Sequence, residues 1–210
     1  MITVYHLATS RSERIVWLLE ELGLPYGIER FDRRPDRFAP DELKGVSPTG
    51  KAPALRDGDV VLAESGAIVS YVLARHGGGG LLPAPADADF PAYQFWLHHA
   101  EGSLGAQLMR EMTIDRLNPD ADAHPGMARV RRTTRDALAL VEDTLGRTPY
   151  IAGERFTGAD IMMPFWFTTA LRFRPLDLAP YPGIRAYLDR IADRPAYRRA
   201  MQVAGPDVTG

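Results

Sequence analysis

The sequence predicts an α/β N-terminal domain followed by an all-α helical bundle. Up to about residue 76, short apolar runs alternate with helical patterns, whereas beyond about residue 88 every periodic segment has helical spacing. Between these regions lie four consecutive glycines, at 77–80, and a proline-spaced run that cannot continue a helix. We therefore expect domains at 1–78 and 89–210, joined by a linker at 79–88.

The first domain is expected to have the element order βαβ-α-ββα. Apolar residues at i, i+3, i+4 and i+7 from Ile15 predict its first helix, which Gly23 ends. Asp57-Gly58 suits a tight turn between two strands. The first two strands should be parallel and the last two antiparallel. The expected segments are strand 2–6, helix 15–22, strand 26–31, short helix 39–44, strands 54–56 and 59–62, and helix 64–76.

The second domain is expected to be helical throughout. Thr157-Gly158-Ala159-Asp160 is a capping box, and the residues on either side are spaced as a hydrophobic staple. Pro164 should bend the helix that this box begins. Four arginines between 129 and 135 are interpreted as a solvated helix face with acids nearby. We expect one helix over 88–116, a second over 125–145, a third that begins near 157, a fourth that includes 184–191, and a short last helix after Pro195.

Composition and charge exclude several classes of protein. Lys and Arg total 25 against 27 Asp and Glu, so no global basic field favours a nucleic-acid partner. No apolar run approaches ~20 residues, so no membrane span is expected. The first residues show no signal-peptide pattern, which indicates a cytoplasmic protein. With no cysteine and no chelating histidine spacing, we expect no metal site, and any reacting thiol must come from a ligand.

Four motifs follow one another in an order that resembles the cytosolic glutathione transferase family. They are Ser10–Gly23 (SRSERIVWLLEELG), Ser47–Leu55 (SPTGKAPAL), Leu62–Ile68 (LAESGAI) and Phe156–Asp160 (FTGAD). The resemblance covers nearly the whole chain. It is closest to a microbial, serine-type branch that shares the Ser-Arg start, the run Arg37–Lys44 and the run Ala100–Leu104.

The resemblance implies a thioredoxin-like N-terminal domain that binds glutathione as co-substrate, a helical domain that holds an electrophile, and a homodimer. By position in the motifs, Ala52 before a cis Pro53 would bind the cysteinyl part of glutathione through its backbone. Glu64 and Ser65 would hold the γ-glutamyl end. Lys51 would lie near the glycyl carboxylate, with Arg37 a weaker candidate there, because this chain lacks the basic residues that other branches place near 38–39.

The family places a hydroxyl that activates the thiol between the first strand and the first helix. We assign this catalytic role to Ser10, because it precedes Arg11, where the resemblance to the branch is tightest. Thr9 is the runner-up, because alignment from Arg14 to Gly23 places the serine of some relatives there. Ser12 and Tyr5 are further candidates. A purely structural interpretation also stands, since Ser10-Arg11-Ser12-Glu13 is itself a capping box.

The motifs say less about the electrophile pocket and the reaction than about the glutathione site. By resemblance, Leu7, Leu104, Leu108 and Met109 are candidates to line an electrophile pocket. The leading hypothesis is conjugation of glutathione to a small hydrophobic electrophile. Glutathione-dependent peroxide reduction, isomerisation and a non-catalytic binding module are the alternatives. The lack of cysteine argues against thiol–disulfide exchange, which usually needs a protein thiol.

Overall fold

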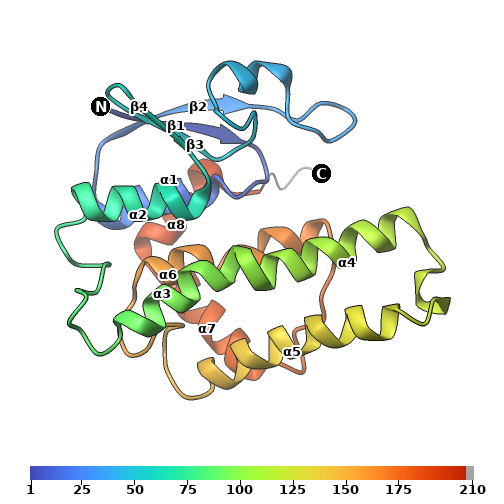
Figure 1. Cartoon of the computed structure of the whole chain (residues 1–210). Coiled ribbons are helices and arrows are strands. Elements are labelled where there is room, and N and C mark those ends of the chain that lie inside the picture. The colour runs from blue at the N-terminus through green and yellow to red at the C-terminus, as the bar shows by residue number, and fades with distance from the viewer. Residues whose placement is uncertain (207–210) are drawn as a thin grey trace. The chain divides into compact units, whose positions relative to one another are not determined.

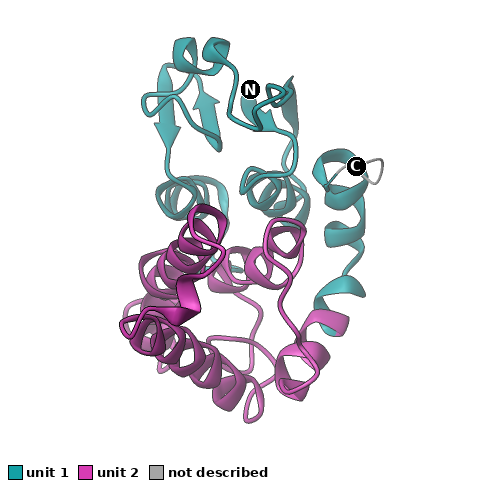
Figure 2. Cartoon of the chain, turned by 90° about the vertical axis from the view of Figure 1, so that its right-hand side faces the viewer, with its two compact units in different colours: residues 1–82, 190–210 teal, residues 83–189 magenta. Residues whose placement is uncertain are grey.

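The computed structural model describes residues 1–206 (Figure 1). The chain forms two compact units, one of residues 1–82 with the segment from 190 onward, the other of residues 83–189 (Figure 2). The sequence grouped 190–210 with the helical domain instead. The difference arises because helix α8 (Pro195–Ala204) packs on the first unit, where the Tyr197 and Trp17 rings lie 4.9 Å apart.

The first unit contains a four-stranded sheet of order β2-β1-β3-β4. Strand β1 pairs parallel with β2 and antiparallel with β3, and β4 pairs antiparallel with β3. This confirms the predicted order and the thioredoxin-like topology. The elements are β1 (Ile2–Leu7), α1 (Glu13–Leu22), β2 (Tyr26–Phe31), the 3-10 helix η1 (Asp41–Gly45), β3 (Ala54–Asp57), β4 (Val60–Ala63) and α2 (Ser65–His76).

The hairpin turn lies one residue later than predicted. Asp57 pairs with Val60, so the two turn residues are Gly58 and Asp59 rather than Asp57 and Gly58. Gly58 has φ +60°, which a glycine adopts without steric cost. The left-handed position therefore falls at the first turn residue. Strand β3 gains Asp57 at the turn, whereas β4 begins one residue later than predicted, at Val60, and ends one residue later, at Ala63.

The second unit is helical, as predicted, with one feature that the sequence did not reveal. The expected helix 88–116 is a helical run made of α3 (Phe90–His99), a π-helical segment η2 (Ala100–Gly105) and α4 (Ala106–Leu117). The π segment contains Gly105, which packs against the Trp166 indole. The remaining helices are η3 (Ala121–Ala123), α5 (Met127–Leu145), α6 (Gly158–Met162), η4 (Pro164–Phe167) and η5 (Thr169–Arg172), and α7 (Pro182–Ala192) begins in this unit.

The predicted capping box is present at the start of α6. The Asp160 carboxylate accepts the Thr157 amide at 2.8 Å, and the Thr157 hydroxyl accepts the Ala159 amide at 3.3 Å. We expected Pro164 to bend this helix, but the helix ends before it. Helix α6 ends at Met162, because a proline cannot continue the helical hydrogen-bond ladder, and Pro164 opens the 3-10 turn η4.

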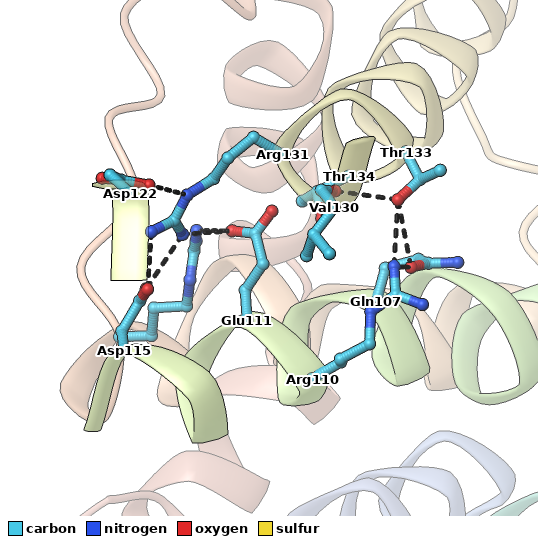
Figure 3. A network of polar contacts seen from close by, with 10 residues as sticks. Gln107, Arg110, Glu111, Asp115, Asp122, Val130, Arg131, Thr133 and Thr134 are labelled. Carbon is cyan, nitrogen blue, oxygen red and sulfur yellow. Dashed lines mark hydrogen bonds and ion pairs between the residues drawn. The ribbon is translucent and has the colours of Figure 1, made fainter. Parts of the chain in front are cut away.

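A polar network links α4 to α5 within the second unit (Figure 3). Glu111 of α4 is 1% exposed, and its carboxylate accepts from Arg131 of α5 at 3.1 Å and from Arg174. Arg131 also binds Asp115 and Asp122, which are the nearby acids that the sequence predicted. Arg129, Arg132 and Arg135 are exposed as expected, whereas Arg131 is half-buried. Within residues 1–206, no helix is long and apolar enough to cross a membrane.

Candidate functional site

The sheet register brings three of the sequence motifs to one edge of the first unit. Tyr5 of β1 pairs with Ala54 of β3, and Ala54 pairs with Ala63 of β4. The loop that follows β1, the residues that precede β3 and the residues that follow β4 therefore leave the sheet at the same end. These segments carry Ser10, the Ala52-Pro53 pair and the Glu64-Ser65 pair, which lie far apart in the sequence.

The hydroxyl of Ser10 is buried and points into the loop that carries it. It donates to the Leu7 carbonyl at 2.8 Å, lies 2.7 Å from the Ser12 hydroxyl and accepts from the Ser12 amide at 3.2 Å. Helix α1 begins at Glu13, with Ser12 rather than Ser10 at the N-cap position. Ser10 is therefore not the N-cap residue of α1, although its hydroxyl accepts an amide in the turn that leads into the helix.

Thr9 occupies the strained position of this loop. Its φ is +52°, a left-handed conformation that a β-branched residue rarely adopts. Its carbonyl accepts from the Arg33 guanidinium at 2.9 Å, and the same side chain donates to Ala8 at 3.0 Å. Within the described part of the chain, the Thr9 hydroxyl itself has no hydrogen-bond partner.

Arg33, which the sequence did not single out, joins the loop after β2 to the loop after β1. Besides Ala8 and Thr9, it donates to the carbonyl of Arg37 at 2.9 Å. Burial, and then the nearby Arg37 charge, lower the pKa of the Arg33 guanidinium. Arg37 has φ +67° and an exposed side chain. One arginine thus fixes three carbonyl groups around the candidate serine loop.

The Ala52-Pro53 peptide bond is cis, as the resemblance implied. It follows a turn in which the Ser47 hydroxyl donates to the Lys51 carbonyl at 2.7 Å. Pro53 is buried, and the Lys51 side chain is exposed. The turn and the proline together fix where the backbone of Ala52 lies at the start of β3.

Glu64 and Ser65 stand at the N-terminus of α2. Glu64 is exposed, with φ +69°, and Ser65 is the first helical residue and is 3% exposed. The first amides of a helix have no intrahelical acceptor and favour an anion. Arg14, 1% exposed in α1, donates to the Ser65 hydroxyl at 3.3 Å. Arg14 was not among the site residues predicted from the sequence, although an arginine within an apolar helix run is a visible signal.

The candidate pocket residues are divided between the two units. Leu7 belongs to the first unit, whereas Leu104, Leu108 and Met109 belong to the second. The three leucines are buried and Met109 is 37% exposed. All the other candidate site residues belong to the first unit.

Comparisons with known proteins place the chain in a family. Residues 1–74 match the glutathione S-transferase N-terminal domain model, and residues 124–190 match the C-terminal domain model. Glutathione S-transferase 3 of Schizosaccharomyces pombe is 34% identical over 96% of this chain and 87% of its own length. The chain belongs to the glutathione S-transferase family.

Two further relatives show the range of proteins that this glutathione S-transferase resembles. A glutathione S-transferase crystal structure from Actinobacillus pleuropneumoniae superposes with a TM-score of 0.87 at 34% identity, covering 100% of this chain and 95% of the other. The disulfide-bond oxidoreductase YfcG of Escherichia coli is 29% identical over 96% of this chain and 94% of its own. The family therefore establishes an enzyme with glutathione-linked activity.

Proposed function

We propose that this glutathione S-transferase conjugates the glutathione thiolate to a small hydrophobic electrophile and belongs to the serine-type microbial branch. The observation that carries the proposal is the convergence of the Ser10 loop, the cis Ala52-Pro53 bond and the Glu64-Ser65 helix start at one sheet edge. Each segment supplies what one part of a tripeptide thiol requires: a hydroxyl, a backbone edge and a helix N-terminus.

Glutathione would lie along these segments in an extended conformation. The backbone of Ala52, before Pro53, pairs with the cysteinyl part. The exposed Glu64 carboxylate takes the γ-glutamyl ammonium, while Ser65 and the first amides of α2 take the adjacent carboxylate. The exposed Lys51 side chain would take the glycyl carboxylate, with the exposed Arg37 as a second cation.

The chemistry requires the thiol to lose its proton. A free thiol with a pKa near 8.5 is only about 3% thiolate at pH 7. Lowering that pKa by about 2 units needs about 2.7 kcal/mol of preferential stabilisation of the anion. One hydroxyl donor to a charged sulfur contributes about 1.5–3 kcal/mol, so a single well-placed hydroxyl is sufficient. Ser10 is our assignment for this donor and Thr9 the runner-up.

The proposal also covers the residues that contact the electrophile, the oligomeric state and the cellular location. As the resemblance implies, Leu7 in the first unit and Leu104, Leu108 and Met109 in the second are our candidates to contact the electrophile, and apolar side chains favour a hydrophobic substrate. The enzyme works as a cytoplasmic homodimer, the usual state of the family. The uneven exposure of these pocket residues makes Met109 the one most open to solvent.

Turnover of a panel of electrophiles tests this function. Halogenated aromatics, isothiocyanates, enals and peroxides are assayed with the full-length enzyme and with Ser10→Ala and Thr9→Ala. Thr144→Ala serves as a matched control, because its exposed hydroxyl also donates to a backbone carbonyl, that of Leu140, but in the other unit. We expect conjugation that only one of the two loop variants loses. A flat profile over all four classes would leave the binding module as the function.

The relative named as a disulfide-bond oxidoreductase favours a second candidate function. In this chain no protein thiol exists, so both electrons would come from glutathione. The bound thiolate attacks a substrate disulfide to give a mixed disulfide and a substrate thiolate. A second glutathione then releases oxidised glutathione and the second substrate thiol. Adding a small symmetric disulfide to the panel, with oxidised glutathione as the measured product, separates this reaction from conjugation.

A further inference from the structure

A buried chain of hydrogen bonds runs behind the candidate catalytic serine. The Nδ1 atom of His6 lies 2.8 Å from the Ser12 hydroxyl, which lies 2.7 Å from the Ser10 hydroxyl. His6 is 1% exposed, Ser12 0% and Ser10 7%. All three belong to the first unit, where β1 contributes His6 and the loop before α1 contributes the two serines.

Each hydroxyl in this chain has one proton and so can donate only one hydrogen bond. The Leu7 carbonyl has two lone pairs and can accept from both hydroxyls, from Ser10 at 2.8 Å and from Ser12 at 3.2 Å. Backbone amides already supply one proton to each hydroxyl oxygen: Leu7 donates to Ser12, and Ser12 donates to Ser10, both at 3.2 Å. Each hydroxyl oxygen therefore has one acceptor position left, and His6 determines whether Ser12 can still accept from Ser10.

When Nδ1 of His6 has no proton, it can only accept. Ser12 then donates to His6, and its oxygen can still accept from Ser10 at 2.7 Å. The Ser10 proton is held inward, by Ser12 or by the Leu7 carbonyl, and is not available to a ligand. When Nδ1 has the proton, His6 donates to Ser12 instead. The Ser12 oxygen then accepts from His6 and from the Leu7 amide, so Ser10 can no longer donate to Ser12, whereas Ser12 can donate to Ser10. The Ser10 proton is left to the Leu7 carbonyl or to a stronger acceptor outside the loop.

We propose that His6, protonated at Nδ1, is a positioning residue that orients the Ser10 hydroxyl toward the glutathione sulfur through Ser12. The inference rests on the proposed function and deepens it. It also gives a reason for the inward hydroxyl of Ser10, which only needs to rotate about its Cβ–Oγ bond when a thiolate offers a stronger acceptor than a neutral carbonyl. No bond other than hydrogen bonds changes in this step.

The tautomer of His6 is measured directly in the unmodified enzyme. The protein is labelled with ¹⁵N in its histidine rings, and the His6 signals are assigned by their loss in His6→Asn. The proposal predicts a proton on Nδ1 when glutathione is bound. An Nδ1 atom without a proton in that complex overturns the proposal and leaves Thr9 as the donor. This readout does not depend on the folding of any relay variant, since the variant only identifies the signals.

A double-mutant cycle measures the coupling between the serines. Ser12→Ala should lower kcat/KM about tenfold, by the loss of one oriented hydrogen bond to charged sulfur. The thiol pKa of bound glutathione, followed by thiolate absorbance, should rise by about one unit, whereas glutathione affinity changes by less than about threefold. In a Ser10→Ala background, Ser12→Ala should have no further effect on kcat/KM. Equal effects in both backgrounds would overturn the relay, because a merely structural loss does not require Ser10.

Failure of the relay and failure of the proposed function are distinguishable. If the unmodified enzyme neither binds nor conjugates glutathione, the function fails whatever the tautomer of His6. If it conjugates glutathione and Ser10→Ala is fully active, the function stands and the relay is overturned. Thr144→Ala again controls for loss of a hydroxyl elsewhere in the chain.

Discussion

The side chain of Arg33 illustrates how one residue can determine the geometry of a site that it does not line. Its guanidinium binds the carbonyls of Ala8, Thr9 and Arg37 at 2.9–3.0 Å. A planar fork of donors can do this, and a lysine ammonium cannot reproduce the arrangement. The left-handed conformation of Thr9 is retained because these hydrogen bonds, together with those of Ser10 and Ser12, hold the loop in place and offset its conformational cost.

Replacing Arg33 by lysine should therefore reduce catalysis more than binding. We expect Arg33→Lys to lower kcat about tenfold, because misplacing a reacting group is costly, while the Kd for glutathione changes little. Arg34→Lys is the control, since Arg34 is an exposed neighbour that pairs with Asp36. Steady-state kinetics and calorimetry separate the two effects. Equal kcat values for the two variants would show that Arg33 does not position the loop.

Among the secondary-structure elements, the π-helical segment η2 is specified by close packing. A Cβ atom built on Gly105 would lie 2.7 Å from the Cε2 atom of Trp166 and 2.8 Å from the Ala100 carbonyl oxygen. Both distances are far below van der Waals contact. Only glycine therefore allows the indole to approach this turn of the helix.

Gly105→Ala should lower the free energy of unfolding by about 1–3 kcal/mol, because the added methyl forces Trp166 or the backbone to move. Gly102→Ala in the same segment is a matched control, because nothing lies within 4 Å of its added Cβ. That variant should be neutral or slightly stabilising, since alanine favours a helix over glycine. Urea unfolding of both variants gives the comparison. Similar losses in the two would show that the close approach to Trp166 has no energetic consequence.

The capping box of α6 makes the second unit sensitive to pH. Burial raises the pKa of Asp160 to about 6, even though four donors, from Ile151, Thr157 and Tyr187, bind the carboxylate. The ordinary value is near 4 in an unfolded chain. The folded state therefore binds the proton more tightly, and this residue stabilises the fold at low pH and loses that contribution as pH rises through 6.

The unfolding free energy of the enzyme relative to Asp160→Asn should consequently change with pH. Between pH 7 and pH 5 it should shift in favour of the unmodified enzyme by about 1 kcal/mol. The asparagine variant removes the ionisation and keeps the size of the side chain. Urea unfolding of both proteins at the two pH values provides the measurement. A difference that is independent of pH would mean that Asp160 titrates normally in the folded state.

The Glu111 network connects α4, α5 and the segment after η5. Glu111 is buried, whereas its partners Arg131 and Arg174 are 24% and 21% exposed. The hydrogen bond that Arg131 donates to the Asp115 carboxylate is the first cause that raises the pKa of Arg131. Glu111→Gln should cost about 2 kcal/mol of stability, less than for a fully buried pair, because water partly compensates the two arginines. Asp122→Asn, at a residue 76% exposed, should cost much less. Thermal unfolding ranks the two, and equal losses would contradict the network's dependence on Glu111.

For the whole molecule, apolar periodicity and turn residues predicted the helices and strands, but they did not predict how all of these elements divide between the two units. The strand 26–31 has the predicted bounds, and Gly23 ends α1 with φ +62° as its position suggested. The sequence grouped the segment from residue 190 with the helical domain, whereas in the structure it belongs to the first unit, because an apolar helix face does not specify which surface it covers. Its attachment depends on long-range contacts such as Arg194 with Glu21 at 2.7 Å.

The candidate site divides in the same way. The family resemblance made Ser10, Pro53, Glu64 and Ser65 candidates, because each lies at a turn or helix start with a recognisable local sequence. It did not single out Arg14, Arg33 or His6, whose contacts with the candidate segments come from partners that the fold supplies. From the sequence alone, Arg33 is an arginine in a polar loop, where such a side chain is usually solvated. Only the fold shows that it donates to the carbonyls of Ala8 and Thr9. Long-range hydrogen bonds of this kind have no local sequence signal.

Calorimetric titration of glutathione at pH 7, in two buffers of different ionisation enthalpy, tests the central claim most directly. The claim is that the first unit binds glutathione and ionises its thiol. We predict binding accompanied by release of most of one proton per site, because a thiol whose pKa falls by about 2 units is mostly thiolate at pH 7. Heats that do not depend on the buffer would contradict thiol ionisation. An absence of binding at millimolar glutathione would contradict the site itself.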